Sequence, residues 1–148
     1  LYRYVNSYRD SAPADQVLKL EVTGKHLETR IDPYQLDQVL DNLVANAMRH
    51  TSVENGQRKV EIHLFHHPRL LLPVVEVCDS GPGVPADEED VLFEPFHTTE
   101  KSGTGLGLYI CRELCEINRA RLDYVQRPAQ GACFRITFAH PKSLGLNK

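Results

Sequence analysis

The chain has 148 residues, of which 41% are hydrophobic and 25% are charged. This length favours one domain with a single hydrophobic core, and the composition is that of an ordinary globular protein. The formal net charge of −3 and the lack of a long basic run argue against a nucleic-acid-binding protein. The longest apolar run, Leu70 to Val75, is interrupted by Pro73 and is too short to cross a bilayer.

The chain begins with Leu1 rather than Met and shows no signal peptide, so we expect it to be a piece of a longer protein. Its cysteines stand at positions 78, 111, 115 and 133, without a Cys-x-x-Cys pair. We interpret all four as free, buried thiols rather than as metal ligands or disulfides, which agrees with a reducing, cytosolic setting.

The first third of the chain predicts a helix, a hairpin and a second helix. Residues 1–9 have apolar side chains at helical spacing, and residues 17–22 alternate as a strand does. The pair Thr23-Gly24 predicts a turn, with a return strand at 27–31. Asp32 followed by Pro33 marks the start of a long helix, because Asp caps the free amides and Pro suits the first helical position.

The long helix, which we expect to end near His50, has one apolar face and a polar border. Asn42, Asn46 and Arg49 lie within about 60° of each other on a helical wheel. Asn is unfavourable in mid-helix, so these side chains are either a solvated edge or ligand-binding groups. An Asn oxygen on such a helix suits a hydrated Mg²⁺.

Further elements follow a polar loop at 51–57. They are strands at 58–65, 73–78, 121–126 and 133–140, and a helix at 105–118. Between them, residues 84–104 form a long irregular segment. Segments of this length in a compact domain are usually functional lids, for which Phe93 and Phe96 would supply an apolar anchor.

Asp79 ends the strand at 73–78 and carries the sharpest functional signal. By alternation it shares a face with Val75 and Val77, so we expect it to point inward. A buried carboxylate needs partners, and the alternatives are a cap or turn role and the recognition of a base amino group. Gly81 and Gly83 would leave room for a flat ring.

A second glycine cluster opens the helix at 105–118. Glycine amides at a helix start can approach phosphate oxygens, and the helix dipole favours anions there. Thr104 adds a hydroxyl, and Lys101 adds a positive charge near a terminal phosphate. The cluster is neither a P-loop nor a dinucleotide fingerprint, since no Gly-Lys-Ser/Thr follows and no strand precedes it.

Together these motifs resemble the ATP-binding catalytic domain of bacterial sensor histidine kinases, within the superfamily of Hsp90, DNA gyrase and the MutL proteins. Gln38-Val-Leu-Asp-Asn-Leu-Val-Ala-Asn-Ala-Met-Arg-His-Thr51 is similar to the N box of that family. Asp79-Ser-Gly-Pro-Gly83 is similar to its first glycine box, Phe93-Glu-Pro-Phe96 to its F box, and Gly103-Thr-Gly-Leu-Gly-Leu108 to its second glycine box. The likeness covers roughly residues 15 to 140.

The resemblance implies an α/β sandwich of the Bergerat type, in which helices cover one face of a mixed sheet. It implies one catalytic domain over residues 1–148, with the end of a dimerisation helix at 1–10 and an ATP lid at 84–104. Asp79 would read adenine, Asn46 would bind Mg²⁺, and Asn42 and Lys101 would act in catalysis. The implied ATP-binding residues are Asn42, Asn46, Arg49, His50, Asp79, Gly81, Gly83, Val84, Phe96, Thr98, Thr99, Lys101, Gly103, Thr104, Gly105, Leu106, Gly107 and Leu108.

Two departures from the family pattern concern the mechanism. Relatives that hydrolyse ATP carry Glu four residues before the metal-binding Asn, and this chain has Asn42 there. Asn is a poor base, which favours phosphoryl transfer to a protein side chain over hydrolysis. Arg49 stands where many relatives have Lys, so the positive charge is kept with a different geometry.

The short lid, Phe96-His-Thr-Thr-Glu-Lys101, is similar to that of the nitrogen-regulation group of sensor kinases. Within that group the chain is most similar to the sensors of type IV pilus expression, through Glu113-Leu-Cys-Glu116, Ala120-Arg-Leu-Asp-Tyr124 and Cys133-Phe-Arg-Ile-Thr-Phe-Ala-His-Pro141. Such a kinase transfers the γ-phosphate of Mg-ATP to a His on its own dimerisation domain, as a homodimer. The resemblance implies a response regulator of the sigma-54 enhancer-binding type as the partner. It also implies a full-length protein in the inner membrane with this domain in the cytoplasm. The acceptor pattern His-Glu-x-Arg-Asn-Pro-Leu is missing from this sequence. The alternatives are a stand-alone serine kinase of the anti-sigma-factor type and a non-catalytic nucleotide-dependent interaction module.

Overall fold

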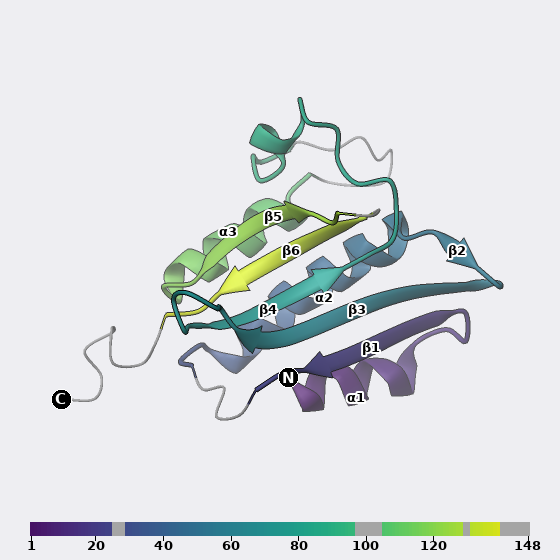
Figure 1. Ribbon diagram of the computed structural model, residues 1–148, viewed down its shortest axis with the longest axis horizontal. Helices are drawn as coiled ribbons and strands as arrows, with labels where there is room; N and C mark the ends of the chain where they lie inside the picture. Colours follow the sequence, from purple (N-terminus) through teal and green to yellow (C-terminus); the bar gives the residue numbers. More distant parts are fainter. Residues whose placement is uncertain (25–28, 97–104, 129–130, 140–148) are drawn as a thin grey trace.

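The computed structural model of the chain describes residues 1–24, 29–96, 105–128 and 131–139. One mixed sheet carries three α-helices (Figure 1). In chain order the elements are α1 (Tyr2–Ser11), β1 (Gln16–Val22), α2 (Pro33–His50), β2 (Val53–Glu54), β3 (Gln57–His66), β4 (Pro73–Cys78), the 3-10 turn η1 (Glu89–Val91), α3 (Gly107–Ile117), β5 (Arg121–Gln126) and β6 (Ala132–Thr137).

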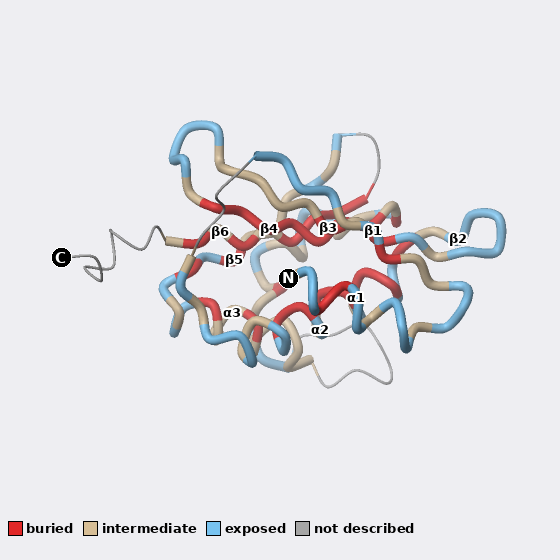
Figure 2. The backbone as a smooth tube through the Cα atoms, turned by 90° about the horizontal axis from the view of Figure 1, so that it is seen from below, coloured by how far each residue is buried: buried red, intermediate tan, exposed pale blue. Residues whose placement is uncertain are grey.

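The strand order is β1-β3-β4-β6-β5, and β2 pairs with the start of β3. β1 runs parallel to β3, whereas the other neighbours in the sheet are antiparallel. The helices lie on one face of the sheet, as the view from below shows (Figure 2). The predicted α/β sandwich with a mixed sheet covered on one face is therefore confirmed.

The core lies between the helices and the covered sheet face. α2 begins as predicted, because the Asp32 carboxylate accepts hydrogen bonds from the Tyr34 and Gln35 amides at 2.9 and 3.0 Å. Its apolar stripe packs against the alternate strand residues that face it. The fully buried members of this core include Val39, Leu40, Leu43, Val44, Val60, Ile62 and Ile136.

Three details of the predicted elements are wrong. Residues 29–31 belong to no strand, and β1 pairs with β3 instead of forming the expected hairpin; residues 25–28 lie outside the described part of the chain. The 51–57 loop contains the short strand β2, which pairs antiparallel with the first two residues of β3. β6 ends at Thr137 and α3 begins at Gly107, because the alternating and helical patterns extend beyond the hydrogen-bonded residues.

The prediction of four free thiols is correct for only two cysteines. Cys111 and Cys115 are free and buried in the core. Cys78 and Cys133 instead form a disulfide, because the register of β4 and β6 sets them directly opposite each other. Their spacing of 55 residues gives no local signal, so only the sheet register brings them together.

α1 is attached to the body of the domain through its aromatic side chains. The Tyr4 hydroxyl donates to Asp41 on α2 at 2.9 Å, and the Tyr8 hydroxyl donates to Gln16 on β1 at 2.6 Å. Burial, and then the Asp41 carboxylate, raise the pKa of Tyr4 strongly. Among the described residues, no helix has the length and apolar character that a membrane span requires.

Candidate functional site

The Asp79 side chain lies at the carboxyl end of β4 and is 4% exposed. Its Oδ1 accepts a hydrogen bond from the Gly81 amide at 2.8 Å, while its own amide donates to the Ala132 carbonyl at 2.9 Å. Burial raises the pKa of the Asp79 carboxyl above its ordinary value of 3.8, although the Gly81 hydrogen bond opposes this change. The inward orientation predicted from alternation is therefore confirmed, and part of the carboxylate is already held by the loop that follows.

Two glycines allow the backbone to pass close to Asp79. A Cβ atom added at Gly81 would overlap the carbonyl oxygen of His50 at the end of α2. A Cβ atom at Gly131 would overlap the Asp79 carbonyl oxygen, and Gly131 also has a φ of +111°. Neither position admits a side chain, so the end of α2, the end of β4 and the start of β6 approach each other here through their main chains.

Hydroxyl groups join the end of α2 to the loop after Asp79. The Thr51 side chain donates to the Lys59 carbonyl at 3.0 Å and accepts from the Ser80 amide at 3.2 Å. The Ser52 hydroxyl donates to the Ser80 carbonyl at 2.9 Å. These bonds fix the two predicted motifs, the N box and the first glycine box, relative to each other.

The polar border of α2 faces the start of α3. A Cβ atom added at Gly107 would lie 3.8 Å from the Asn42 Oδ1, so Asn42 and the second glycine box are neighbours. Asn46 is half-buried one turn further on, and its Oδ1 lies 3.4 Å from the Arg49 guanidinium. The N-cap residue of α3, Leu106, makes no side-chain capping bond to the first turn, and the start of this helix is of the kind that binds anions.

The described part of the predicted lid is anchored to the sheet. The Val84 amide donates to the Tyr124 hydroxyl at 2.9 Å, and Gly83 precedes it with a φ of +79°. Phe93 packs edge-on against Phe134, with ring centroids 6.0 Å apart. These contacts give the segment before residue 97 a fixed base on β5 and β6.

The two ends of the remaining lid segment meet. The Phe96 amide donates to the Gly105 carbonyl at 2.8 Å, and the Phe96 ring is 74% exposed. Leu108 packs on the core with the first turn of α3. Thr98, Thr99, Lys101, Gly103 and Thr104, which were predicted to contact ATP, lie outside the described residues.

The site includes residues that sequence reasoning did not assign to it. Ser52, Tyr124 and Arg127 hold its loops, and the Arg127 guanidinium donates to the Asp79 carbonyl at 3.1 Å. Gly131 permits the close approach of β6. The only sequence signal for these residues was the turn at 127–131, because their roles depend on which strands are neighbours.

Comparison with known proteins agrees with this arrangement. Residues 31–142 match the family model described as "Histidine kinase-, DNA gyrase B-, and HSP90-like ATPase". The chain is 52% identical over 144 residues to the sensor protein kinase PilS of Pseudomonas aeruginosa, which covers 97% of this chain and 27% of PilS. The chain thus spans about a quarter of the length of that relative.

Solved structures show the same fold. The nucleotide-free catalytic domain of the histidine kinase ThkA is similar to this chain, with 28% identity, a TM-score of 0.71, and coverage of 93% of this chain and 86% of that domain. ThkA has also been solved in complex with the response regulator protein TrrA. That structure has 26% identity to this chain and a TM-score of 0.66, and the match covers 93% of this chain and 37% of that chain. Full-length ShkA in complex with AMPPNP matches in fold, with 23% identity and a TM-score of 0.74. The match covers 93% of this chain and 28% of the ShkA chain.

The four predicted motifs, the contacts that join the end of α2 to the loop after Asp79, and these matches lead to one assignment. The chain belongs to the histidine kinase-, DNA gyrase B- and HSP90-like ATPase family, as an ATP-binding catalytic domain of the sensor histidine kinase type.

Proposed function

We propose that this domain binds Mg-ATP between α2, the end of β4 and the start of α3, and supplies its γ-phosphoryl group to a histidine on a separate dimerisation domain. The observation that carries the proposal is the buried Asp79 carboxylate at the end of β4. The Gly81 amide occupies Oδ1, so we assign Oδ2 to the adenine amino group. A carboxylate that keeps one oxygen for a ligand donor is suited to accept a hydrogen bond from the adenine amino group.

We further infer that Asn46 is the protein ligand of Mg²⁺. The residues fit this ion, because Asn46 offers a neutral oxygen from a helix, and Mg²⁺ keeps several waters and takes the rest of its ligands from phosphates. The ion would neutralise charge on the phosphate oxygens. Arg49 and His50 follow on the same helix and would meet the phosphates as cation and hydrogen-bond donor.

Asn42 and the amides at the start of α3 would surround the phosphates on the other side. The approach of Gly107 to the Asn42 Oδ1 supports this assignment. Asn42 has no basic group to activate water, so we assign it to positioning the phosphates for transfer. We assign Lys101, with Phe96, Thr98, Thr99, Gly103 and Thr104, to the lid over the phosphates, from sequence resemblance alone.

The full-length protein is proposed to be a homodimeric sensor in the inner membrane, with this domain in the cytoplasm. The phosphoryl group would pass from its phosphohistidine to a response regulator, for which we propose the sigma-54 enhancer-binding type. The relative PilS is named a sensor protein kinase, and ThkA has been solved with a response regulator, which supports this proposal.

The deciding experiment mixes this domain with a separately supplied dimerisation domain and ATP labelled at the γ-phosphate. Acid-labile label on a histidine of the dimerisation domain is the expected result. Label on serine would favour the anti-sigma-factor type of kinase. Nucleotide binding without any transfer would contradict the kinase assignment.

A further inference from the structure

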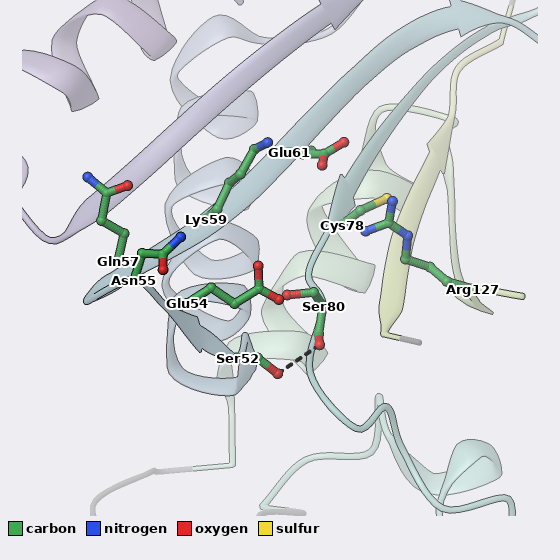
Figure 3. A pocket seen from close by; sticks show the side chains of 9 residues that line it. All are labelled: Ser52, Glu54, Asn55, Gln57, Lys59, Glu61, Cys78, Ser80 and Arg127. Carbon is green, nitrogen blue, oxygen red and sulfur yellow. Dashed lines mark hydrogen bonds between the residues drawn. The ribbon is translucent and has the colours of Figure 1, made fainter. Parts of the chain in front are cut away.

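The face of the sheet that the helices leave uncovered contains a cavity directly behind Asp79. The cavity has a volume of about 300 Å³, and Cys78 forms part of its wall (Figure 3). Cys133, the disulfide partner of Cys78, does not line it. Both cysteines are buried, with exposed fractions of 1% for Cys78 and 6% for Cys133, so exposure alone would not favour Cys78. A small molecule bound in the cavity would nevertheless meet the disulfide from the Cys78 side.

The walls of the cavity carry charges of both signs. Lys59 and Arg127 contribute cations, and Glu54 and Glu61 contribute carboxylates. Figure 3 shows these side chains arranged around the opening, with the Arg127 guanidinium extended from the turn after β5. Such a lining suits a small zwitterion, because it can pair both with carboxylates and with an ammonium group.

We propose that this cavity is a docking site for a zwitterionic low-molecular-weight thiol of the glutathione class, which exchanges with the Cys78–Cys133 disulfide. The thiolate attacks the Cys78 Sγ, the bond between the protein sulfurs breaks, and Cys133 leaves as a thiolate. A second small thiolate then attacks the small molecule's own sulfur in the mixed disulfide that Cys78 carries. This step releases the small-molecule disulfide and the Cys78 thiolate, so that two small thiols supply the two electrons that reduce the protein.

The exchange would act on the site through the two strands that the disulfide joins. Cys78 directly precedes Asp79, and Cys133 directly follows Ala132, whose carbonyl accepts the Asp79 amide at 2.9 Å. The disulfide is therefore one residue away, on both strands, from the hydrogen bond that positions Asp79. Breaking it, or adding a bulky group at Cys78, removes a covalent restraint at this point.

The other two cysteines provide an internal control. Cys111 and Cys115 are buried on the covered side of the sheet. Burial raises the pKa of both thiols to about 12, so almost no thiolate is present at neutral pH. Modification by a small disulfide should therefore leave these two residues unchanged.

The chemistry is tested with two matched variants treated with glutathione disulfide. Cys133→Ser leaves Cys78 free at the cavity, and Cys78→Ser leaves Cys133 free away from it. Peptide mass spectrometry should find rapid mixed-disulfide formation at Cys78 in the first variant and much slower modification of Cys133 in the second. Equal rates in the two variants, or no modification of Cys78, would overturn the proposal.

Charge recognition is tested separately from reactivity. In the Cys133→Ser background, Lys59→Gln should slow modification by glutathione disulfide but not by the neutral hydroxyethyl disulfide. Lys19→Gln, on the same sheet face but paired with Glu21 outside the cavity, should change neither rate. The wild-type protein gives the same comparison without substitution, through reduction of its disulfide by glutathione and by neutral mercaptoethanol at equal thiolate concentrations. If Lys59→Gln slows modification by both disulfide reagents, or by neither, the proposal that the cavity docks a charged thiol is contradicted.

The effect on nucleotide rests on the proposed function. Couplings between two sites are commonly about 5- to 150-fold in affinity, and we expect the reduced protein to bind ATP about fivefold more weakly than the oxidised one. Equal affinities would show that the exchange does not regulate the site. Absence of ATP binding in both forms would instead refute the proposed function and leave the mass-spectrometric result standing.

Discussion

Replacement of Asp79 by Asn reverses one hydrogen-bonding group where we place the adenine amino group. The Gly81 amide donates to Oδ1, and an Asn side chain keeps this bond by keeping its oxygen on that side. The amide NH₂ then takes the position of Oδ2. Two donors, the Asn amide and the adenine amine, would face each other there.

The expected loss follows from two contributions. A hydrogen bond to a charged group contributes about 1.5–3 kcal/mol, and a buried donor left without a partner costs about 1–3 kcal/mol. Together they amount to about 2.5–6 kcal/mol, which corresponds to a loss of ATP affinity on the order of 10²- to 10⁴-fold.

Calorimetric titration of the wild type and the variant with Mg-ATP measures this difference. Asp123→Asn is the matched control, since Asp123 pairs with Arg121 on the uncovered sheet face. The control should bind as the wild type does. If Asp79→Asn keeps its affinity within about threefold, or about 0.6 kcal/mol, the assignment of Asp79 to adenine is refuted.

The same substitution predicts a gain in fold stability. The raised pKa of Asp79 means that its contribution to stability is present below 3.8 and is lost as the pH rises through the folded-state pKa. Asn carries no charge to bury, so the variant should be the more stable protein at neutral pH. Urea unfolding midpoints of the two proteins should diverge as the pH rises from about 4 to about 7. If the unfolding midpoints of the two proteins instead changed with pH in parallel, Asp79 would have no raised pKa.

Three further substitutions test other parts of the site. Asn46→Ala should weaken ATP binding in Mg²⁺ and leave the weaker binding in chelator unchanged, whereas Gln38→Ala on the exposed part of α2 should change neither titration. Gly81→Ala should lower the free energy of unfolding by about 1–3 kcal/mol through overlap with a helix carbonyl. Gly107→Ala, where a Cβ would make only an ordinary contact at 3.8 Å, is the stability control for the loss of a glycine. Equal melting temperatures of the two variants would contradict the close approach at Gly81. Tyr124→Phe removes the acceptor for the first lid amide and should lower stability by about 0.5–1.5 kcal/mol, measured by urea unfolding; an unchanged midpoint would show that this bond contributes nothing.

The sequence predicted those parts of the fold that depend on local pattern. Capping by Asp32, the apolar stripe of α2 and the alternation that turns Asp79 inward are properties of short segments, and the structure has all three. Pairing between distant segments was missed. The parallel pairing of β1 with β3 and the Cys78–Cys133 disulfide depend on the sheet order, which no short window contains.

The residues of the candidate site fall into the same two groups, those that a local sequence pattern reveals and those that depend on the sheet order. Asp79, Asn42 and the glycine boxes were found because their residue types suit a nucleotide at fixed spacings. Arg127 and Gly131 were missed as site residues, because a turn between two strands has an ordinary composition. Their importance appears only when the start of β6 is seen against the Asp79 backbone.

Hydrogen bonds attach α1 to the helix that carries Asn42 and Asn46 and to the edge strand β1. The hydroxyl of Tyr4 bonds to Asp41, which directly precedes Asn42, and the hydroxyl of Tyr8 holds the other end of the helix to the edge strand. The N-terminal helix is therefore bonded to the residue next to Asn42. Under the proposed function, a displacement of α1 would be transmitted through Asp41 to the helix that positions the phosphates.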